Sequence, residues 1–217
     1  MYRIPRIDCN VACPASLEEA FARTVRETVA CNNWPADFPY APQVGFRIFH
    51  TGADLLLRFD VAERCTAART LDDNGPVWTD SCAEFFFRPE GSDSYYNFEC
   101  NCIGTLLVGH RRDRTQAEHA PAEVLRTVRR RATYPHAPLP ETEGDNRWTL
   151  TLAIPAAALF RDRIAGWDGV QGAMNLYKCG DDLSCPHYLS WRPVGTPAPD
   201  FHRPEFFEPA FFEPKKQ

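Results

Sequence analysis

The chain has 217 residues and a formal net charge of −5, and hydrophobic residues make up 44% of it against 24% for charged residues. This balance is typical of a globular protein and argues against disorder, while the negative charge offers no general attraction for nucleic acid or anionic lipid. The net charge therefore gives no reason to expect nucleic acid as a partner. No apolar run approaches the roughly 20 residues that cross a bilayer, so a membrane is not expected as a partner either.

The amino-terminal residues Met1 to Pro5 lack the apolar stretch of a secretory signal peptide. This favours a cytoplasmic protein, unless a signal has been removed. Nine cysteines, an odd number with no repeating spacing, do not form a complete disulfide framework. We therefore expect most or all of them to be free, buried thiols in a reducing compartment.

A helix is predicted near the amino terminus. Ser16 followed by Glu19 is typical of a capping box, in which the two side chains satisfy the first free amides of a helix. Apolar residues then recur at helical spacing, at Leu17, Phe21, Val25 and Val29. One amphipathic helix is expected over residues 16–30, and it ends before Pro35.

After Trp34 the apolar period changes to two, which is typical of half-buried strands. Between Asp54 and Val61, alternate apolar residues share one face, with Leu56 as the exception. Further strands are predicted over residues 44–50, 82–88, 95–108, 127–133, 148–155, 172–178 and 187–192. Turns are predicted at 72–76, 89–93, 143–146 and 179–182, one short helical turn within 120–127, and an irregular wrap over 193–214. Short strands without intervening helices predict an all-β fold, an antiparallel two-sheet β-sandwich of jelly-roll type, formed as a single domain by residues 1–217.

The predicted strand from Tyr95 to Cys102 has two chemically different faces. Its even positions are apolar, whereas its odd positions carry Tyr95, Asn97, Glu99 and Asn101. Such a row offers hydrogen-bond donors and acceptors at fixed spacing, as vicinal sugar hydroxyls require, although a solvated outer face is the competing interpretation. The absence of Lys, Arg and Thr from this row favours a binding role.

Two tryptophans are candidate platforms for a sugar ring. Trp78 follows a predicted turn, where a flat indole can lie open and stack on the apolar face of a pyranose. Glu84 follows on a strand face shared with Cys82 and Phe86, where a carboxylate needs a polar partner. Trp191 is the second candidate, and because Leu189 shares its parity a core position is the stronger interpretation of Trp191.

Metal sites are weakly indicated. The acidic turn residues Asp72, Asp73, Asn74 and Asp80 could bind Ca²⁺, but their spacing does not match an EF-hand loop and ordinary turn chemistry accounts for them. Cys179, Cys185 and His187 do not have a standard zinc spacing.

Several segments together resemble the family 9 carbohydrate-binding modules. Val77 to Phe86 reads VWTDSCAEFF and is similar to a W-x-D-S-x-E-x-F segment of that family, and Tyr95 to Asn101 is similar to the strand that follows it there. Asn175 to Asp181, Pro186 to Trp191 and Pro199 to Pro204 match its closing segments, so the resemblance covers the chain from about Asn33 onward.

The resemblance implies an antiparallel β-sandwich that holds a terminal sugar between Trp78 and Trp191, with Glu84, Glu99 and Asn101 as polar ligands. Glu99 stands where the best-understood modules have an arginine, so the identity of the sugar stays open. Those modules also hold structural calcium, whose ligands the resemblance does not place here, and no other cofactor is expected. They usually accompany glycoside hydrolases, which makes such an enzyme a candidate partner in carbohydrate catabolism.

The leading hypothesis is therefore non-catalytic binding of a mono- or oligosaccharide. A glycoside hydrolase that uses Glu84 and Glu99 as its carboxylate pair is the second hypothesis, because residues on neighbouring strands could meet the required separation. A haem-binding electron-transfer sandwich is the third and weakest, since Met174 is the one internal methionine.

Overall fold

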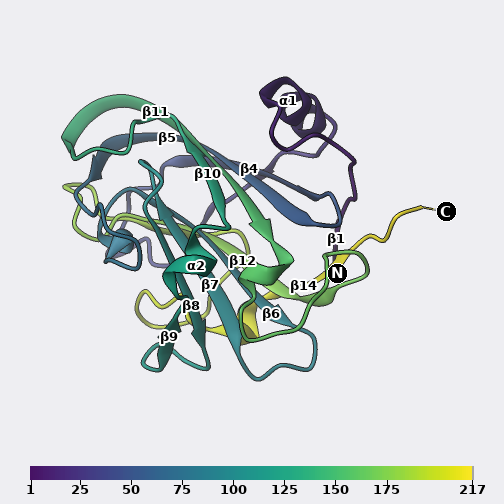
Figure 1. Cartoon of the computed structure of the whole chain (residues 1–217). Helices are drawn as coiled ribbons and strands as arrows, with labels where there is room; N and C mark the ends of the chain where they lie inside the picture. Colours follow the sequence, from purple (N-terminus) through teal and green to yellow (C-terminus); the bar gives the residue numbers. More distant parts are fainter. Residues whose placement is uncertain (217) are drawn as a thin grey trace.

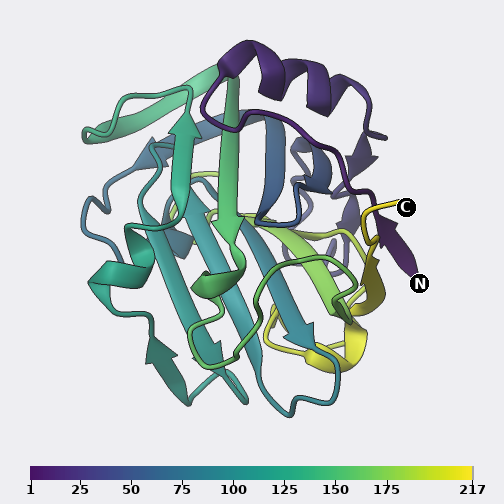
Figure 2. The same ribbon diagram turned by 45° about the vertical axis from the view of Figure 1, so that its right-hand side comes forward.

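Two β-sheets face each other across a hydrophobic core in the computed structural model, which describes residues 1–216 (Figures 1 and 2). The larger sheet has nine strands in these residues: β1 (Tyr2–Ile4), β14 (Glu208–Phe212), β12 (Gln171–Cys179), β6 (Cys82–Pro89), β7 (Tyr95–Asn101), β8 (Leu106–Arg111), β9 (Ala117–His119), and at the side β13 (Tyr188–Ser190) and β3 (Cys31–Asn32). The smaller sheet has five: β10 (Arg129–Ala132), β11 (Leu139–Pro155), β5 (Asp54–Ala68), β4 (Gln43–His50) and β2 (Glu27–Thr28).

The strand pairs are antiparallel except for β1 and β14, which run parallel and bring the two ends of the chain to the same side of the molecule (Figure 1). The predicted two-sheet antiparallel sandwich is confirmed. None of the helices in the described part of the chain is long and apolar enough to span a membrane.

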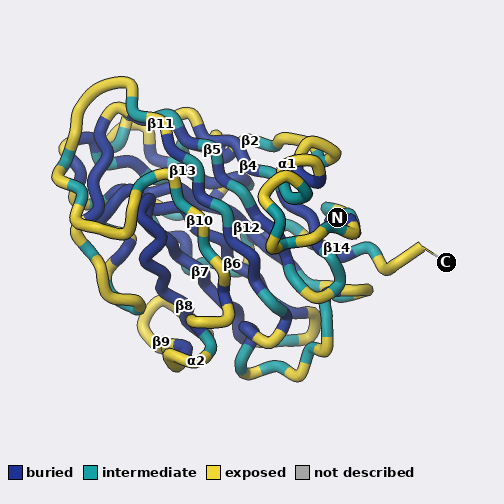
Figure 3. Tube along the Cα trace, turned by 45° about the horizontal axis from the view of Figure 1, so that its top comes forward, coloured by how far each residue is buried: buried dark blue, intermediate teal, exposed yellow. Residues whose placement is uncertain are grey.

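The period-two pattern of β5 shows how the sequence builds the core. Leu55, Leu57 and Phe59 point between the sheets and are fully buried there. Leu56 points the other way, where helix α1 (Pro14–Ala22) covers it with Phe21. The apolar exception in the pattern therefore marks the place where the helix packs on the outside of the smaller sheet. Figure 3 shows the central strands as dark, buried segments between exposed loops.

The helix differs from its prediction. It begins after Cys13 with Pro14 in its first turn and ends at Ala22. Ser16 lies inside the helix and not at its N-cap, and its hydroxyl accepts a hydrogen bond from the backbone amide of Asn10. The expected capping box therefore does not form. Pro14 starts the helix earlier because its fixed φ suits a first turn and it has no amide to satisfy. Val25 lies beyond the helix and is exposed.

Three other predictions need correction. The run 95–108 is two strands, β7 and β8, because the chain turns at Gly104, whose φ of 91° is a left-handed conformation that favours glycine. Residues 143–146 are not a turn but an irregularity within β11, where the register against β5 shifts. The carboxy-terminal wrap ends in the regular strand β14. The predicted helical turn within 120–127 is confirmed as α2 (Ala122–Leu125).

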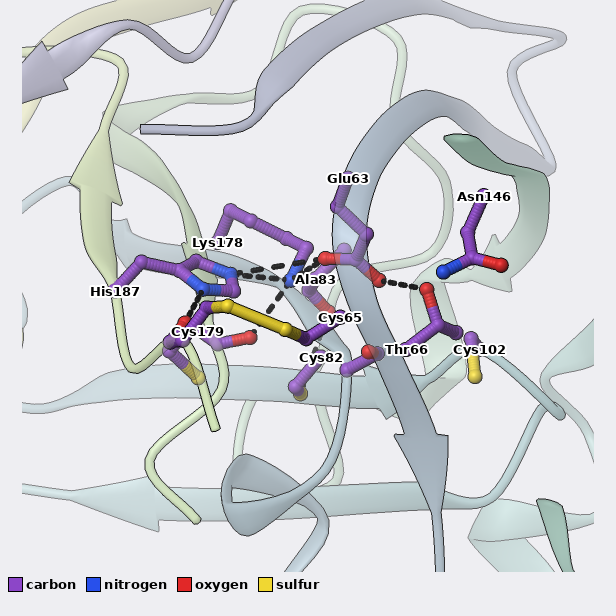
Figure 4. A network of polar contacts seen from close by, with 12 residues as sticks. Glu63, Cys65, Thr66, Cys82, Ala83, Cys102, Asn146, Lys178, Cys179 and His187 are labelled. Atoms are coloured by element: carbon purple, nitrogen blue, oxygen red, sulfur yellow. Dashed lines mark hydrogen bonds and ion pairs between the residues drawn. A yellow bond between two sulfur atoms is a disulfide. The ribbon is translucent and has the colours of Figure 1, made fainter. Parts of the chain in front are cut away.

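A buried ion pair joins the two sheets (Figure 4). Lys178 of β12 places its Nζ 2.8 Å from Oε2 of Glu63 in β5 and 2.7 Å from Nε2 of His187, and all three residues are buried. Trp148 donates to the other oxygen of Glu63 at 2.7 Å. Burial has the largest single effect and would raise the pKa of Glu63, but Lys178, His187 and the hydrogen bond from Trp148 together outweigh it and hold the pKa below its usual range, so the carboxylate is charged. Burial and Lys178 together lower the pKa of His187 to about 3, which leaves it neutral.

Beside this pair, a disulfide links Cys65 to Cys185 (Figure 4), and the other seven cysteines are free. The expectation that most cysteines are thiols therefore holds, whereas this pairing was not foreseen. The two residues are 120 positions apart, and only the approach of β5 to the loop before β13 brings them together. Met174 is fully buried among the core residues between the two sheets.

Candidate functional site

A cavity of about 430 Å³ opens on the outer face of the larger sheet. Its floor comes from the strands β6, β7 and β12, and its walls come from loops that cross this face. Four aromatic residues, four acidic residues and three basic residues line it, with Cys179 and Pro199: Phe38, Trp78, Tyr188, Phe201; Glu84, Glu99, Asp181, Asp200; Arg111, Arg114, His202. The combination of flat apolar surfaces and convergent polar groups is typical of a small-molecule site.

Strand alternation places Glu84 and Glu99 on the cavity floor. In β6, Phe85 and Phe87 point into the core between the sheets, so Glu84 points outward. In β7, Phe98 likewise points inward and Glu99 outward. The register of the two antiparallel strands sets Glu84 directly opposite Glu99. Directly opposed side chains have Cβ atoms about 4.5–5.5 Å apart, so the two carboxyl groups are immediate neighbours.

Both carboxyl groups are almost wholly buried, each residue being 3% exposed. Burial raises the pKa of Glu84 well above its usual range, and the neighbouring Glu99 raises it further. Burial also raises the pKa of Glu99, to about 7, although a hydrogen bond from Asn97 works against it. Two adjacent carboxylates in a low-dielectric site repel each other, so the pair holds a proton more readily than exposed glutamates do.

Hydrogen bonds fix one oxygen of each carboxyl group. Cys179 approaches Oε1 of Glu84 at 3.0 Å, and the Asn97 amide donates to Oε1 of Glu99 at 2.7 Å. Arg111 in turn donates to the carbonyl of that amide at 2.9 Å, which orients it. The floor is therefore preorganised before any ligand enters.

Trp78 lies at the rim, in a 3-10 turn over Val77–Thr79. Val77 is fully buried and anchors the turn. The Trp78 carbonyl accepts a hydrogen bond from the backbone amide of Asp181 at 3.2 Å. Trp78 is 38% exposed, which is unusual for so large an apolar residue. It is thus available for stacking, and the structure brings it together with Glu84 and Glu99 around one cavity as predicted.

Asn101 does not reach the cavity. Its side-chain nitrogen donates hydrogen bonds to the Thr70 carbonyl at 2.9 Å and to the Asp80 carboxylate at 3.0 Å. Its side-chain oxygen accepts a hydrogen bond from the backbone amide of Thr105. Asp80 also accepts the backbone amides of Arg69 and Thr70. Asn101 is therefore a structural residue that closes the loop preceding Trp78, and its predicted place in the site is corrected.

Trp191 does not face Trp78 either. It is 4% exposed and packs in the core, where its ring lies 5.0 Å from that of Tyr2 and 5.6 Å from that of Phe46. The physical reason is the alternation of side chains along an extended chain. Leu189 and Trp191 both point between the sheets, while Tyr188 points outward to the cavity. The two-tryptophan sandwich is replaced by Trp78 and a wall that includes Tyr188.

The sequence patterns did not indicate this aromatic wall. Phe38 and Tyr188 meet edge to face with ring centroids 4.7 Å apart, and Phe201 follows 6.2 Å from Tyr188. The alternation in β13 could have indicated Tyr188, whereas Phe38 and Phe201 come from irregular segments that carry no such signal. Arg111, at the end of β8, was also missed.

The candidate metal ligands are placed differently from their predictions. Cys185 is in a disulfide and His187 contacts Lys178, so neither forms a zinc site with Cys179. Asp73 forms an ion pair with Arg130 and accepts a hydrogen bond from the backbone amide of Leu106, as expected of a residue in a turn. Within residues 1–216, a group that could hold a metal ion is Cys82, Glu84 and Cys179, whose ligand atoms lie within 4.8 Å of one another. Burial raises the pKa of both thiols, so binding a metal there would require them to lose protons against that effect.

The family model described as carbohydrate-binding family 9 matches residues 13–212. A crystal structure from Bacteroides uniformis, of a protein assigned to carbohydrate binding by inference, superimposes with a TM-score of 0.91 at 39% identity and covers 97% of this chain and 98% of its own.

Two structures of a family 9 carbohydrate-binding module from Caldicellulosiruptor kristjanssonii, in complex with glucose and with cellotriose, share the fold. Both superimpose with a TM-score of 0.59. The glucose complex is 9% identical and covers 99% of this chain and 96% of its own; the cellotriose complex is 7% identical and covers 100% and 95%. A comparison with functionally curated proteins gave no match.

Proposed function

This chain belongs to carbohydrate-binding family 9, and we propose that the cavity on the outer face of its larger sheet binds a terminal sugar or a short oligosaccharide without cleaving it. The observation that carries the proposal is the exposed Trp78 at the rim of a cavity whose floor is the buried pair Glu84 and Glu99. The glucose and cellotriose bound by the modules from Caldicellulosiruptor kristjanssonii support a sugar as the class of ligand.

Each part of the site has a distinct task in this proposal. Trp78 stacks on the apolar face of a pyranose, because an indole offers a large rigid surface with few rotatable bonds. Tyr188 supplies a second aromatic contact from the wall. Glu84 and Glu99 hydrogen-bond to the sugar hydroxyls and fix the orientation of the ring, because a carboxyl group offers acceptor oxygens and, when protonated, a donor as well.

Replacement of Trp78 tests this proposal. Burying a large apolar side chain against a ligand stabilises the complex by about 1.5–3 kcal/mol, so Trp78→Ala should weaken sugar binding by about tenfold or more. Isothermal titration calorimetry against a panel of hexoses and disaccharides measures the change. Leu71→Ala is the matched control, because Leu71 is 37% exposed but does not line the cavity. Equal affinities in wild type and Trp78→Ala would contradict the proposal.

Hydrolysis by Glu84 and Glu99 is less well supported. A glycosidase places its two carboxyl groups on either side of the scissile bond, with one as acid and the other as nucleophile or base. Here both groups project from the same floor, side by side on adjacent strands, so both meet the same side of a ligand. Release of nitrophenol from nitrophenyl glycosides would refute the non-catalytic assignment. A role in carbohydrate catabolism beside a glycoside hydrolase suits a site of this kind and forms part of the proposal.

A further inference from the structure

The paired carboxylates on the cavity floor each keep one oxygen open. Oε1 of Glu84 is taken by Cys179 and Oε1 of Glu99 by Asn97. Neither Oε2 accepts a hydrogen bond from residues 1–216, and neither is among the fully enclosed side-chain atoms that lack a partner. Both Oε2 atoms are therefore reachable from the cavity that the two residues line.

The pair also lacks a cation in direct contact with either carboxyl group. Elsewhere in this chain the buried carboxylate of Glu63 has its own cation, the ammonium group of Lys178 at 2.8 Å. Glu84 and Glu99 form no ion pair with any residue in the described chain; Arg111, which lies nearest in the hydrogen-bond network, is committed to Asn97 and to the Arg114 carbonyl. Burying charge without a partner is costly, and burial raises the pKa of both carboxyl groups accordingly.

The charges of the whole cavity point the same way. Four carboxyl groups line it against two guanidinium groups. The third basic residue, His202, adds no charge near neutral pH, because burial and the nearby arginines lower its pKa to about 3. Burial raises the pKa of Glu84, Glu99 and Asp181, so an empty cavity does not carry the full charge of its four carboxyl groups. A positively charged ligand beside the carboxyl groups would favour their charged form, whereas a neutral sugar would not.

We propose that the cavity selects an amino sugar, a hexose with a free amino group, and that the ammonium group lies between the Oε2 atoms of Glu84 and Glu99. The inference rests on the proposed function, because it concerns the same cavity and the same stacking on Trp78. An ammonium group donates up to three hydrogen bonds and brings the missing charge, so it can contact both carboxylates at once. A hydroxyl at that position donates one hydrogen bond and brings no charge.

Calorimetric titration with matched sugars tests the selection. The probes are glucose with glucosamine, galactose with galactosamine, and mannose with mannosamine, each at about pH 7, together with the three N-acetylated forms. In at least one pair the amino sugar should bind about tenfold more tightly than its parent hexose, because two charge-assisted hydrogen bonds replace neutral ones. N-acetylation removes the charge and should abolish this preference.

Two variants tie the preference to the carboxylate pair. Glu99→Gln should bring the ratio of the two affinities close to one, because one of the two carboxyl groups proposed to contact the ammonium group is lost. Glu19→Gln is the matched control, since Glu19 is exposed on α1, which packs on the other sheet, and the ratio should stay as in wild type.

The outcomes separate this inference from the proposed function. If parent hexoses bind at least as tightly as their amino sugars in every pair that binds, the inference is overturned and the proposed function stands. If no sugar of any kind binds, both are overturned. If Glu99→Gln keeps the full preference for an amino sugar, the assignment of the ammonium group to this pair is wrong.

Discussion

Replacing Glu99 by glutamine should stabilise the protein at high pH and not at low pH. The substitution keeps the shape of the side chain and an oxygen that can accept the hydrogen bond from Asn97, but it removes the buried charge. In the folded protein burial raises the pKa of Glu99 to about 7, against a usual value of 4.5. Between these values the folded state binds more protons than the unfolded state. The stability of the wild-type protein therefore falls as the pH rises through this window. Glu99→Gln does not lose this stability, because glutamine does not ionise.

The expected magnitude follows from the same values. The pKa rises from 4.5 to about 7, and a difference of one in pKa corresponds to about 1.4 kcal/mol, so the full effect is about 3–4 kcal/mol. The directly opposed Glu84 remains in the variant and keeps its own burial cost. We therefore expect a gain of about 1–3 kcal/mol in the free energy of unfolding above pH 7, and a much smaller one at about pH 5.

Urea denaturation followed by circular dichroism, at about pH 5 and about pH 8, measures this difference. Glu19→Gln serves again as the control, because the same loss of charge at an exposed site should change stability little at either pH. A gain of equal size at both pH values, or a loss of stability at about pH 8, would refute the reasoning that the site carries a buried, unpartnered charge. A confirmed gain would mean that Glu99 is kept at the expense of stability, as is common for residues that serve binding.

Three further predictions concern the rest of the molecule. Trp191→Ala should lower the free energy of unfolding by about 3–5 kcal/mol in urea denaturation, because it leaves a cavity in the core; a protein of unchanged stability would return Trp191 to the list of binding residues. Glu63→Gln should cost about 3–5 kcal/mol in the same assay, because it leaves the charge of Lys178 buried without a partner, and a change below about 1 kcal/mol would contradict a charged pair. Thiol titration of the unfolded protein should find seven reactive groups before reduction and nine after it, whereas nine before reduction would exclude the Cys65–Cys185 disulfide.

Local patterns in the sequence predicted most of the sandwich. In a strand, successive side chains point to opposite faces whatever the strand pairs with, so the alternation in residues 54–61 and 95–102 was enough to assign which residues share a face. The same rule placed Glu84 and Glu99 on one side of their strands and the neighbouring phenylalanines on the other. With Trp78, these two glutamates are the members of the predicted site that the structure brings together.

The sequence could not predict the parts that depend on contacts between distant segments. An apolar period of two indicates that a strand has two different faces, but not which of them a loop will cover. The polar row in β7 is buried because the segments around Phe38 and Phe201 cross the outer face of the sheet. Phe38 and Phe201 themselves lie in irregular segments, and no local spacing indicates where such segments will lie over the sheet.

By itself, the sequence determined the strands, their two faces and the resemblance to a family of sugar-binding domains, because these depend on residue type and short spacing. The tertiary structure alone decided that Glu84 lies opposite Glu99, that Asn101 is tied to Asp80, and that Cys65 meets Cys185. Strand register and loop packing set these contacts, and both follow from the burial of the whole core, to which residues throughout the chain contribute.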